Sequence, residues 1–114
     1  MKMTGKLDYL ELPALNGTLD ATKAFYAGAF GWSFTDYGPT YAAFDEGLEG
    51  GFQADREEAS EKPLPVLYAE HVDAVLNAVK GAGGRITRDI YAFPGGRRFH
   101  FTDPAGNELA VWGA

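Results

Sequence analysis

The sequence predicts an α+β fold in which two βαβββ modules with curved mixed sheets form a concave cleft. The first observation is that one order of elements, a strand, a helix and three strands, occurs twice within 114 residues. The second is a polar, proline-containing segment between the two copies. The third is that 46% of the residues are apolar, which is ample for the core of a single domain over residues 1–114.

The first module is expected over residues 5–54 and begins with a strand that ends at Pro13. Thr18 is placed to cap a helix, and Gly31 supplies a left-handed residue to end it. Leu19 and Tyr26 belong to a wide apolar stripe on this helix, which should face the core. The aromatic residues expected in that core are Phe25, Tyr26, Phe30 and Trp32. The elements expected are strands over residues 6–12, 33–37, 41–45 and 50–53, and a helix over 19–30.

A linker is expected over about residues 55–63, because this stretch is too polar to bury a face. The second module then covers residues 64–114. Val72, Leu76 and Val79 share one face of a predicted helix. Residues 103–107 are typical of a tight hairpin turn. The strands expected in this module cover residues 64–69, 85–91, 98–102 and 108–112.

Charge and composition narrow the classes of partner. Ten Lys and Arg against sixteen Asp and Glu give a net charge of −6, which disfavours nucleic acid and weakly favours a cationic ligand. The absence of cysteine excludes disulfides and thiolate metal sites. No signal-like apolar run lies in residues 1–7, and no stretch approaches a membrane span. We therefore expect a cytoplasmic protein with no membrane partner.

Three sequence motifs carry a resemblance that covers nearly the whole chain. They are the strand YLELPA from Tyr9, the pair AFY and FGW around Gly31, and GGRRFHFTDPAGNELAVW from Gly95. This pattern resembles the vicinal oxygen chelate superfamily, which includes glyoxalases, extradiol dioxygenases, fosfomycin resistance enzymes and bleomycin-binding proteins. The resemblance implies the glyoxalase-like fold and a homodimer, but the fold hosts many reactions.

The positions that hold metal ligands in this superfamily look empty here. They fall on Tyr9, on Leu64 or Val66, on Ala110, and within residues 50–52. We therefore expect no cofactor and no metal. The alternative is a rebuilt divalent-cation site, for which the only plausible set is Glu11, Glu49, His100 and Glu108.

Strand alternation suggests which side chains line the cleft. In the strand around His100 the phenylalanines should face the core, which places Arg98 and His100 on the opposite face. His100 is the best candidate for proton transfer, assisted by Glu11 or Glu108. The residues expected to bind ligand are Tyr9, Tyr41, Arg98 and Trp112.

Three functions stay open from the sequence. The first is a small-molecule binder that uses an aromatic-lined cleft without metal. The second is a lyase or isomerase that uses His100 with Glu11 or Glu108 as acid and base. The third is a partner-binding protein with no small ligand.

Overall fold

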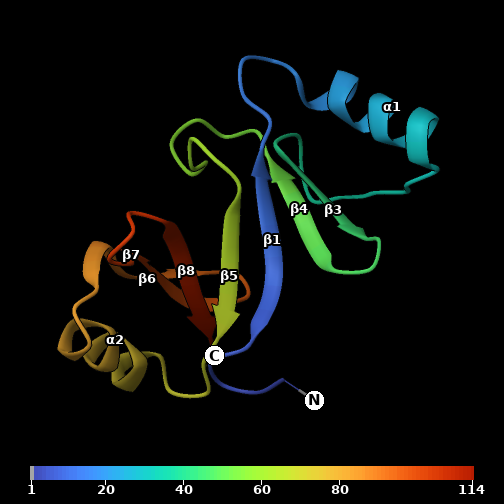
Figure 1. The fold of residues 1–114 in the computed structure, drawn as a ribbon. Coiled ribbons are helices and arrows are strands. Elements are labelled where there is room, and N and C mark those ends of the chain that lie inside the picture. Colours follow the sequence, from blue (N-terminus) through green and yellow to red (C-terminus); the bar gives the residue numbers. More distant parts are fainter. Residues whose placement is uncertain (1) are drawn as a thin grey trace. The chain divides into compact units, whose positions relative to one another are not determined.

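The computed structural model of the protein has an α+β fold, as predicted (Figure 1). It describes residues 2–114; Met1, with which the predicted domain begins, lies outside the described residues. Within the described residues, neither helix has the length and apolar character needed to cross a bilayer. The elements are β1 (Leu7–Pro13), α1 (Leu19–Phe30), β2 (Thr35–Asp36), β3 (Tyr41–Asp45), β4 (Glu49–Gln53), β5 (Leu64–Tyr68), α2 (Val72–Gly81), β6 (Arg85–Phe93), β7 (Gly96–Thr102) and β8 (Glu108–Gly113).

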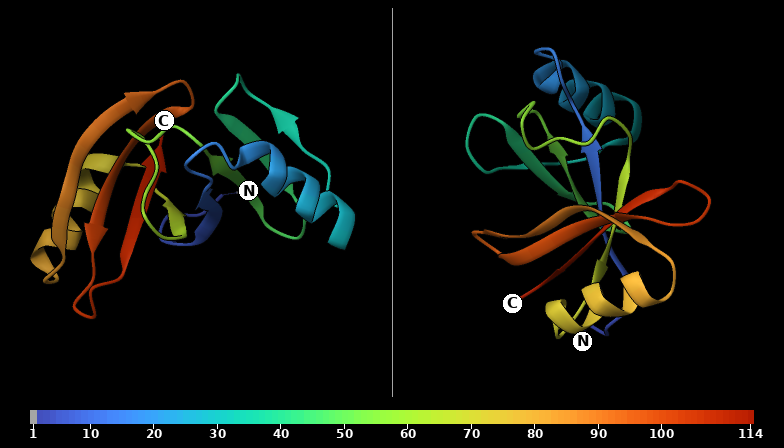
Figure 2. Two further views of the ribbon diagram at one scale, coloured as in Figure 1. Left: turned by 90° about the horizontal axis from the view of Figure 1, so that it is seen from above. Right: turned by 90° about the vertical axis from the view of Figure 1, so that its left-hand side faces the viewer.

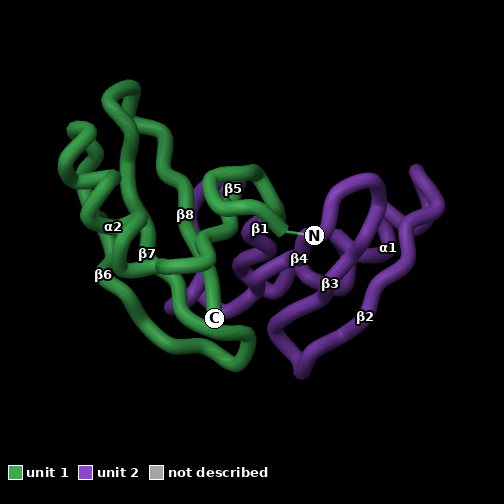
Figure 3. Tube along the Cα trace, turned by 90° about the horizontal axis from the view of Figure 1, so that it is seen from below, with its two compact units in different colours: residues 1–8, 65–114 green, residues 9–64 purple. Residues whose placement is uncertain are grey.

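The chain divides into two compact units (Figure 3). Unit 1 comprises Met1–Asp8 and Pro65–Ala114, of which residues from Lys2 onward are described, and unit 2 comprises Tyr9–Leu64. The beginning of β1 belongs to unit 1, where the Lys6 carbonyl accepts a hydrogen bond from the Tyr68 amide at 3.1 Å. The predicted linker and the predicted cleft between the modules stay predictions.

Unit 2 contains a mixed sheet in the order β2-β3-β4-β1. β1 runs parallel to β4, and the other pairs are antiparallel. Ala14, Phe44 and Phe52 are buried on one face of this sheet. Leu19 and Tyr26 of α1 pack against them. The helix therefore contacts that face of the sheet along a narrow strip of its surface.

The prediction that four aromatic residues around α1 are buried was half right. Tyr26 stacks on Trp32 with ring centroids 4.7 Å apart, and both pack against the core. Phe25 and Phe30, by contrast, are 59% and 64% exposed. They lie outside the narrow stripe that Leu19 and Tyr26 present to the sheet, and they contact each other edge to face at 6.2 Å.

The two ends of α1 also differ in how far they follow the prediction. Gly31 ends the helix in the left-handed region with φ of 73°, as expected. Thr18 does not cap the helix, because its hydroxyl donates to the Leu15 carbonyl at 2.6 Å. That bond draws the side chain back along the preceding turn and away from the amides of the first helical turn.

Unit 1 repeats the topology with the order β5-β8-β7-β6, in which β5 and β8 are parallel. Helix α2 covers one face of this sheet (Figure 2). Phe99 and Phe101 point from β7 into the core beneath α2, as the alternation predicted. The buried core residues here are Ala69, Val72, Leu76, Phe99, Phe101 and Val111.

The turn between β7 and β8 is held by one carboxylate, as predicted for a tight hairpin. Asp103 accepts hydrogen bonds from the backbone amides of Ala105 and Asn107, both at 2.9 Å, and from the Asn107 side chain. These bonds favour the ionised form, and the Asn107 side chain contributes most to lowering the pKa of Asp103. Gly106 takes a φ of 88°, which favours glycine.

The parallel pairing of β1 with β4 depends on a close approach at Gly50. Gly50 is buried and lies opposite Leu10 in the register. A Cβ at this position would overlap the Leu10 carbonyl oxygen and would lie 2.6 Å from the Phe44 ring. No side chain larger than hydrogen therefore fits without moving the strand.

We predict that Gly50→Ala destabilises the protein by about 1–3 kcal/mol, since overpacking shifts a strand and a core ring. Gly28→Ala is the matched control, because Gly28 lies in α1 with open space around its Cβ position. That substitution should stabilise the protein by about 0.5–1 kcal/mol through helix propensity. Urea unfolding measures both, and equal midpoints for the two variants would contradict the close approach.

Candidate functional site

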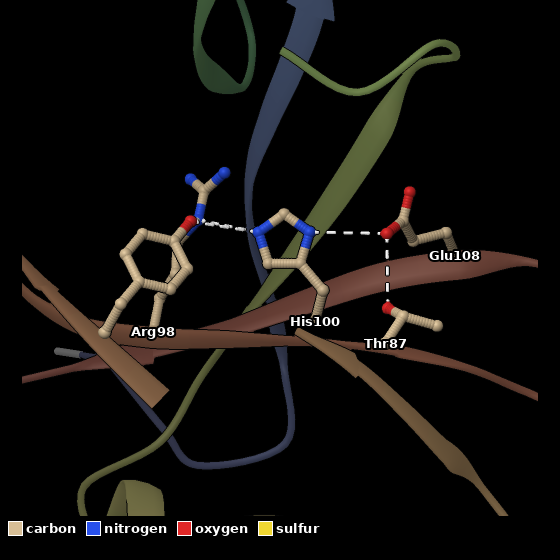
Figure 4. Close-up of polar contacts among 5 residues, drawn as sticks. Thr87, Arg98, His100 and Glu108 are labelled. Atoms are coloured by element: carbon tan, nitrogen blue, oxygen red, sulfur yellow. Dashed lines mark hydrogen bonds and ion pairs between the residues drawn. The ribbon is translucent and has the colours of Figure 1, made fainter. Parts of the chain in front are cut away.

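His100 lies in the middle of β7, on the face of the unit 1 sheet opposite α2. It is only 4% exposed. Its Nδ1 lies 3.4 Å from Oε2 of Glu108, which projects from the neighbouring strand β8 on the same face. Glu108 also accepts a hydrogen bond from the Thr87 hydroxyl at 3.3 Å. Figure 4 shows that the Glu108 carboxylate contacts both His100 and Thr87.

The other imidazole nitrogen contacts two further side chains. Nε2 of His100 lies 3.0 Å from the Tyr91 hydroxyl and 3.2 Å from Nε of Arg98. The Arg98 Nε also donates to the Tyr91 oxygen at 2.5 Å. A carboxylate accepts and a guanidinium donates, so these partners assign the hydrogen to Nδ1 and the lone pair to Nε2.

The surroundings hold His100 in its neutral form. Burial is the largest cause that lowers the pKa of His100 below its ordinary value of 6.5, and the positive charge of Arg98 adds to it. The charge and hydrogen bond of Glu108 oppose this shift, while Arg88 reinforces it. A neutral imidazole carries its basic lone pair on Nε2, the nitrogen that Tyr91 and Arg98 contact.

Tyr91 and Arg88 belong to this cluster, and the sequence reasoning missed both. The Arg88 guanidinium lies 3.6 Å from the centroid of the Tyr91 ring. Simple alternation places residues 88 and 91 on opposite faces of a strand. The pairing of β6 with β7, however, shifts register between Ile86 and Arg88 and again between Arg88 and Tyr91. Each shift re-aims the following side chains, as β-bulges do.

Trp112 lies on the same face of β8 and pairs in register with Arg98. Its indole Nε1 donates to Asp8 at 2.8 Å, and its ring contacts Tyr68 at 5.4 Å and Phe93 at 6.4 Å. Tyr68 and Phe93 are thus aromatic neighbours of Trp112, and the Lys2 ammonium lies 5.6 Å from the centroid of its ring. A nearby hollow of about 320 Å³ is lined by Lys2, Met3, Lys6, Leu7, Asp8 and Tyr68, none of which was predicted as a site residue.

Tyr9, Glu11 and Tyr41 belong to unit 2. The hydroxyls of Tyr9 and Tyr41 lie 2.5 Å apart, so the structure brings these two predicted residues together. Tyr41 reaches Tyr9 across β4 at Gly51, where a Cβ would overlap its ring. Glu11 is 5% exposed and lies opposite Gly51 in the register. The roles predicted for these three residues stay predictions.

The structure thus groups the predicted site residues by unit. Arg98, His100 and Glu108 form one cluster in unit 1, with Trp112 beside Arg98. Among residues 2–114, no group of three or more His, Asp or Glu side chains gathers in a way that could hold a metal ion.

Several solved structures share the fold of this chain. Solved structures with the same fold include methylmalonyl-CoA epimerase from Mycobacterium tuberculosis, with a TM-score of 0.70 and 12% identity over 98% of this chain and 89% of that chain. The Mn(II)-bound glyoxalase from Novosphingobium aromaticivorans gives a TM-score of 0.67 and 23% identity over 99% of this chain and 40% of that one. A glyoxalase/bleomycin resistance protein/dioxygenase superfamily member from Vibrio splendidus 12B01 gives a TM-score of 0.70 and 12% identity over 96% of this chain and 100% of that chain.

These identities are low enough that the structures establish the fold alone. A search of curated protein sequences gave no significant match. The sequence model of the glyoxalase/bleomycin resistance protein/dioxygenase superfamily, however, matches residues 6–111. The chain therefore belongs to the glyoxalase/bleomycin resistance protein/dioxygenase superfamily.

Proposed function

We propose that the protein binds a small organic molecule, without a metal ion, on the face of unit 1 that carries His100. The observation that carries this proposal is the buried His100 held between Glu108 and Tyr91, with Trp112 on the same face. A few directed polar groups beside aromatic surface are typical of small-molecule sites. A methylmalonyl-CoA epimerase of the same fold has been solved with methylmalonyl-CoA, and the glyoxalase from Novosphingobium aromaticivorans with Mn(II); both ligands are properties of those proteins.

The donor set supports binding without metal. A divalent cation requires several N or O ligands that converge on one point. In the part of the chain that the structure describes, no group of three or more His, Asp or Glu side chains could hold an ion, and the Nε2 of His100 faces the positive charge of Arg98. A guanidinium at 3.2 Å from the nitrogen that would bind the ion repels a cation.

We predict that a library of small organic compounds contains ligands that shift the NMR signals of residues on this face. His100→Ala and Trp112→Phe should weaken such binding about tenfold, which corresponds to roughly 1.4 kcal/mol. Arg97→Gln is the control, because Arg97 pairs with the exposed Asp73 and should not affect binding. Binding should persist after treatment with EDTA, and the ligand should be recovered unchanged.

Two results would contradict this proposal. One is that elemental analysis finds stoichiometric Zn, Ni, Mn or Fe and that binding is lost when the metal is removed. That result would favour a metal-dependent protein. A library without any ligand for this face would favour the alternative of a partner-binding protein with no small ligand.

A second candidate is an enzyme of the lyase or isomerase type that uses acid–base chemistry. It is favoured by the chain of contacts from Glu108 through His100 to the Tyr91 hydroxyl. A neutral imidazole accepts a proton at Nε2, and the Glu108 carboxylate stabilises the imidazolium that forms. The Tyr91 hydroxyl is then placed to donate or return a proton.

If the protein converts a ligand to product, His100→Ala should abolish the reaction, since loss of a general base lowers a rate by about 100-fold or more. Glu108→Gln should slow the reaction. A steady-state rate assay on the purified variants measures this. An unchanged rate in His100→Ala would remove the assignment. Glu11 stays the alternative partner for acid–base work.

The neutral state of His100 predicts how stability depends on pH. The pKa of His100 is lower in the folded chain than the ordinary 6.5, so the unfolded chain binds a proton more readily. The free energy of unfolding should therefore fall as the pH drops through about 6.5 and stay level above it. His100→Gln should remove this part of the dependence, and urea unfolding across the range measures it.

His71→Gln is the matched control for that titration, since His71 is exposed at the start of α2. The pH dependence should remain in this variant. The same slope in wild type and His100→Gln would show that other groups cause it.

Two further expectations are part of the proposal. A homodimer would suit the exposed rings of Phe25 and Phe30 on α1, since large exposed apolar groups mark interaction surfaces. A cytoplasmic location is consistent with the ordinary, cysteine-free composition.

A further inference from the structure

The ammonium group of Lys2 lies where a carboxylate and an indole ring meet. Its Nζ is 2.6 Å from Oδ1 of Asp8 and 5.6 Å from the centroid of the Trp112 ring. The other oxygen of Asp8, Oδ2, accepts a hydrogen bond from the Trp112 Nε1 at 2.8 Å. The carboxylate is therefore held by the indole through one oxygen and binds a cation through the other.

We propose that Asp8 and Trp112 form a binding site for organic ammonium ions, and that the Lys2 side chain occupies this site when no such ligand is bound. The basis is the juxtaposition of an oriented carboxylate, an indole ring and a bound ammonium group within unit 1. The inference goes beyond the proposed function, because it assigns a site and a class of ligand to residues other than His100.

The surroundings of Asp8 favour a bound cation over a fully hydrated carboxylate. The Asp8 side chain is only 15% exposed, so much of its contact with water is lost. A cation compensates for that loss, and its attraction to the carboxylate increases as water is excluded. Tryptophan is the best aromatic partner for a cation, and the Lys2 ammonium lies within the distance of about 6 Å at which the ring attracts it.

A hollow beside the carboxylate provides room for the organic part of a ligand. Its volume is about 320 Å³, within the range of small-molecule sites, and Asp8 lies in its wall together with Met3, Leu7 and Tyr68. Met3 and Leu7 are 60% and 65% exposed, so apolar surface is uncovered here. An ammonium ion with an apolar body would bind Asp8 and cover these side chains at the same time.

The Lys2 side chain can leave this position while the walls of the hollow stay in place. It is 40% exposed, and other residues fix the segment that follows it to unit 1. The Gly5 amide donates to the Tyr68 carbonyl at 2.9 Å. The Glu70 amide donates to the Thr4 hydroxyl at 2.8 Å. Exposed ion pairs and exposed cation–π contacts are individually weak, so a ligand of the same charge can compete with the lysine.

The charges around the hollow also allow a cation to bind. Lys6 contributes a second ammonium group to the wall, but it is exposed to solvent, which screens its charge. The ion pair of Asp8 is formed with Lys2. When a ligand replaces Lys2, Asp8 and Lys6 balance each other, and the net charge of −6 on the whole chain attracts cations.

The experiment is an NMR titration of the full chain with phenethylammonium, phenethyl alcohol, methylammonium and phenylacetate. Phenethyl alcohol has the shape of phenethylammonium without its charge, methylammonium has the charge without the ring, and phenylacetate has the opposite charge. The readout is the Trp112 indole N–H, which donates to Asp8 and is identified by its absence in Trp112→Phe. We expect phenethylammonium to shift this signal saturably and to bind more tightly than the other three compounds.

Lys2→Met should strengthen the binding of phenethylammonium by about three- to tenfold, since it removes a competitor held by an exposed ion pair and a cation–π contact. Lys6→Met is the matched control, because it removes the same charge from the wall of the same hollow and leaves the ion pair of Asp8 in place. It should change the affinity by about twofold at most. Asp8→Asn should remove the preference for phenethylammonium over phenethyl alcohol.

Any of three results would overturn the cation site. They are equal affinity for phenethylammonium and phenethyl alcohol, equal effects of Lys2→Met and Lys6→Met, and no shift of the Trp112 signal by phenethylammonium even in Lys2→Met. The proposed function is tested separately, because His100→Ala should leave the binding of phenethylammonium intact. Loss of that binding in His100→Ala would assign the ligand to the His100 cluster, so the cation site would fail while the proposed function survives.

Discussion

The burial of His100 between a carboxylate and a phenol is the constraint on which the candidate site depends. An imidazole that is 4% exposed loses most of its hydration, and that loss favours the neutral ring. The neutral ring needs one acceptor for its N–H and one donor for its lone pair, and Glu108 and Tyr91 supply them. Replacing either partner would leave a buried polar group unsatisfied, so the three residues act as one unit.

The irregular strand β6 makes this arrangement possible. A regular strand would send Arg88 and Tyr91 to opposite faces, and one of them would enter the apolar core beneath α2. The two register shifts allow Ile86 and Ile90 to pack in that core while Arg88 and Tyr91 reach the polar face. Bulges disrupt hydrogen bonding between strands locally. In β6 they allow one strand to contribute side chains both to the core and to the candidate site.

The same comparison shows how far sequence patterns reach. Alternation placed Phe99 and His100 on the correct faces because β7 and β8 pair in continuous register. It missed Tyr91 because a bulge has no reliable signal in a single sequence. The apolar stripe of the first helix predicted that Phe25 and Phe30 are buried, whereas both are exposed. A stripe indicates which residues lie on one side of a helix, but it does not indicate how much of that side a sheet covers. The fold class was predictable because it follows from the order of strands and helices along the chain, and local irregularities in pairing do not alter that order.

Family membership and site chemistry answer different questions for this chain. The superfamily relation explains the repeated βαβββ order and the parallel pairing of β1 with β4 and of β5 with β8. It does not select a ligand, because one fold supports many reactions and function resides in particular side chains. In this chain a neutral imidazole lies between a carboxylate on one side and a guanidinium on the other. If this face carries out acid–base chemistry as proposed, His100 would receive the proton and Glu108 would balance the charge that forms on it.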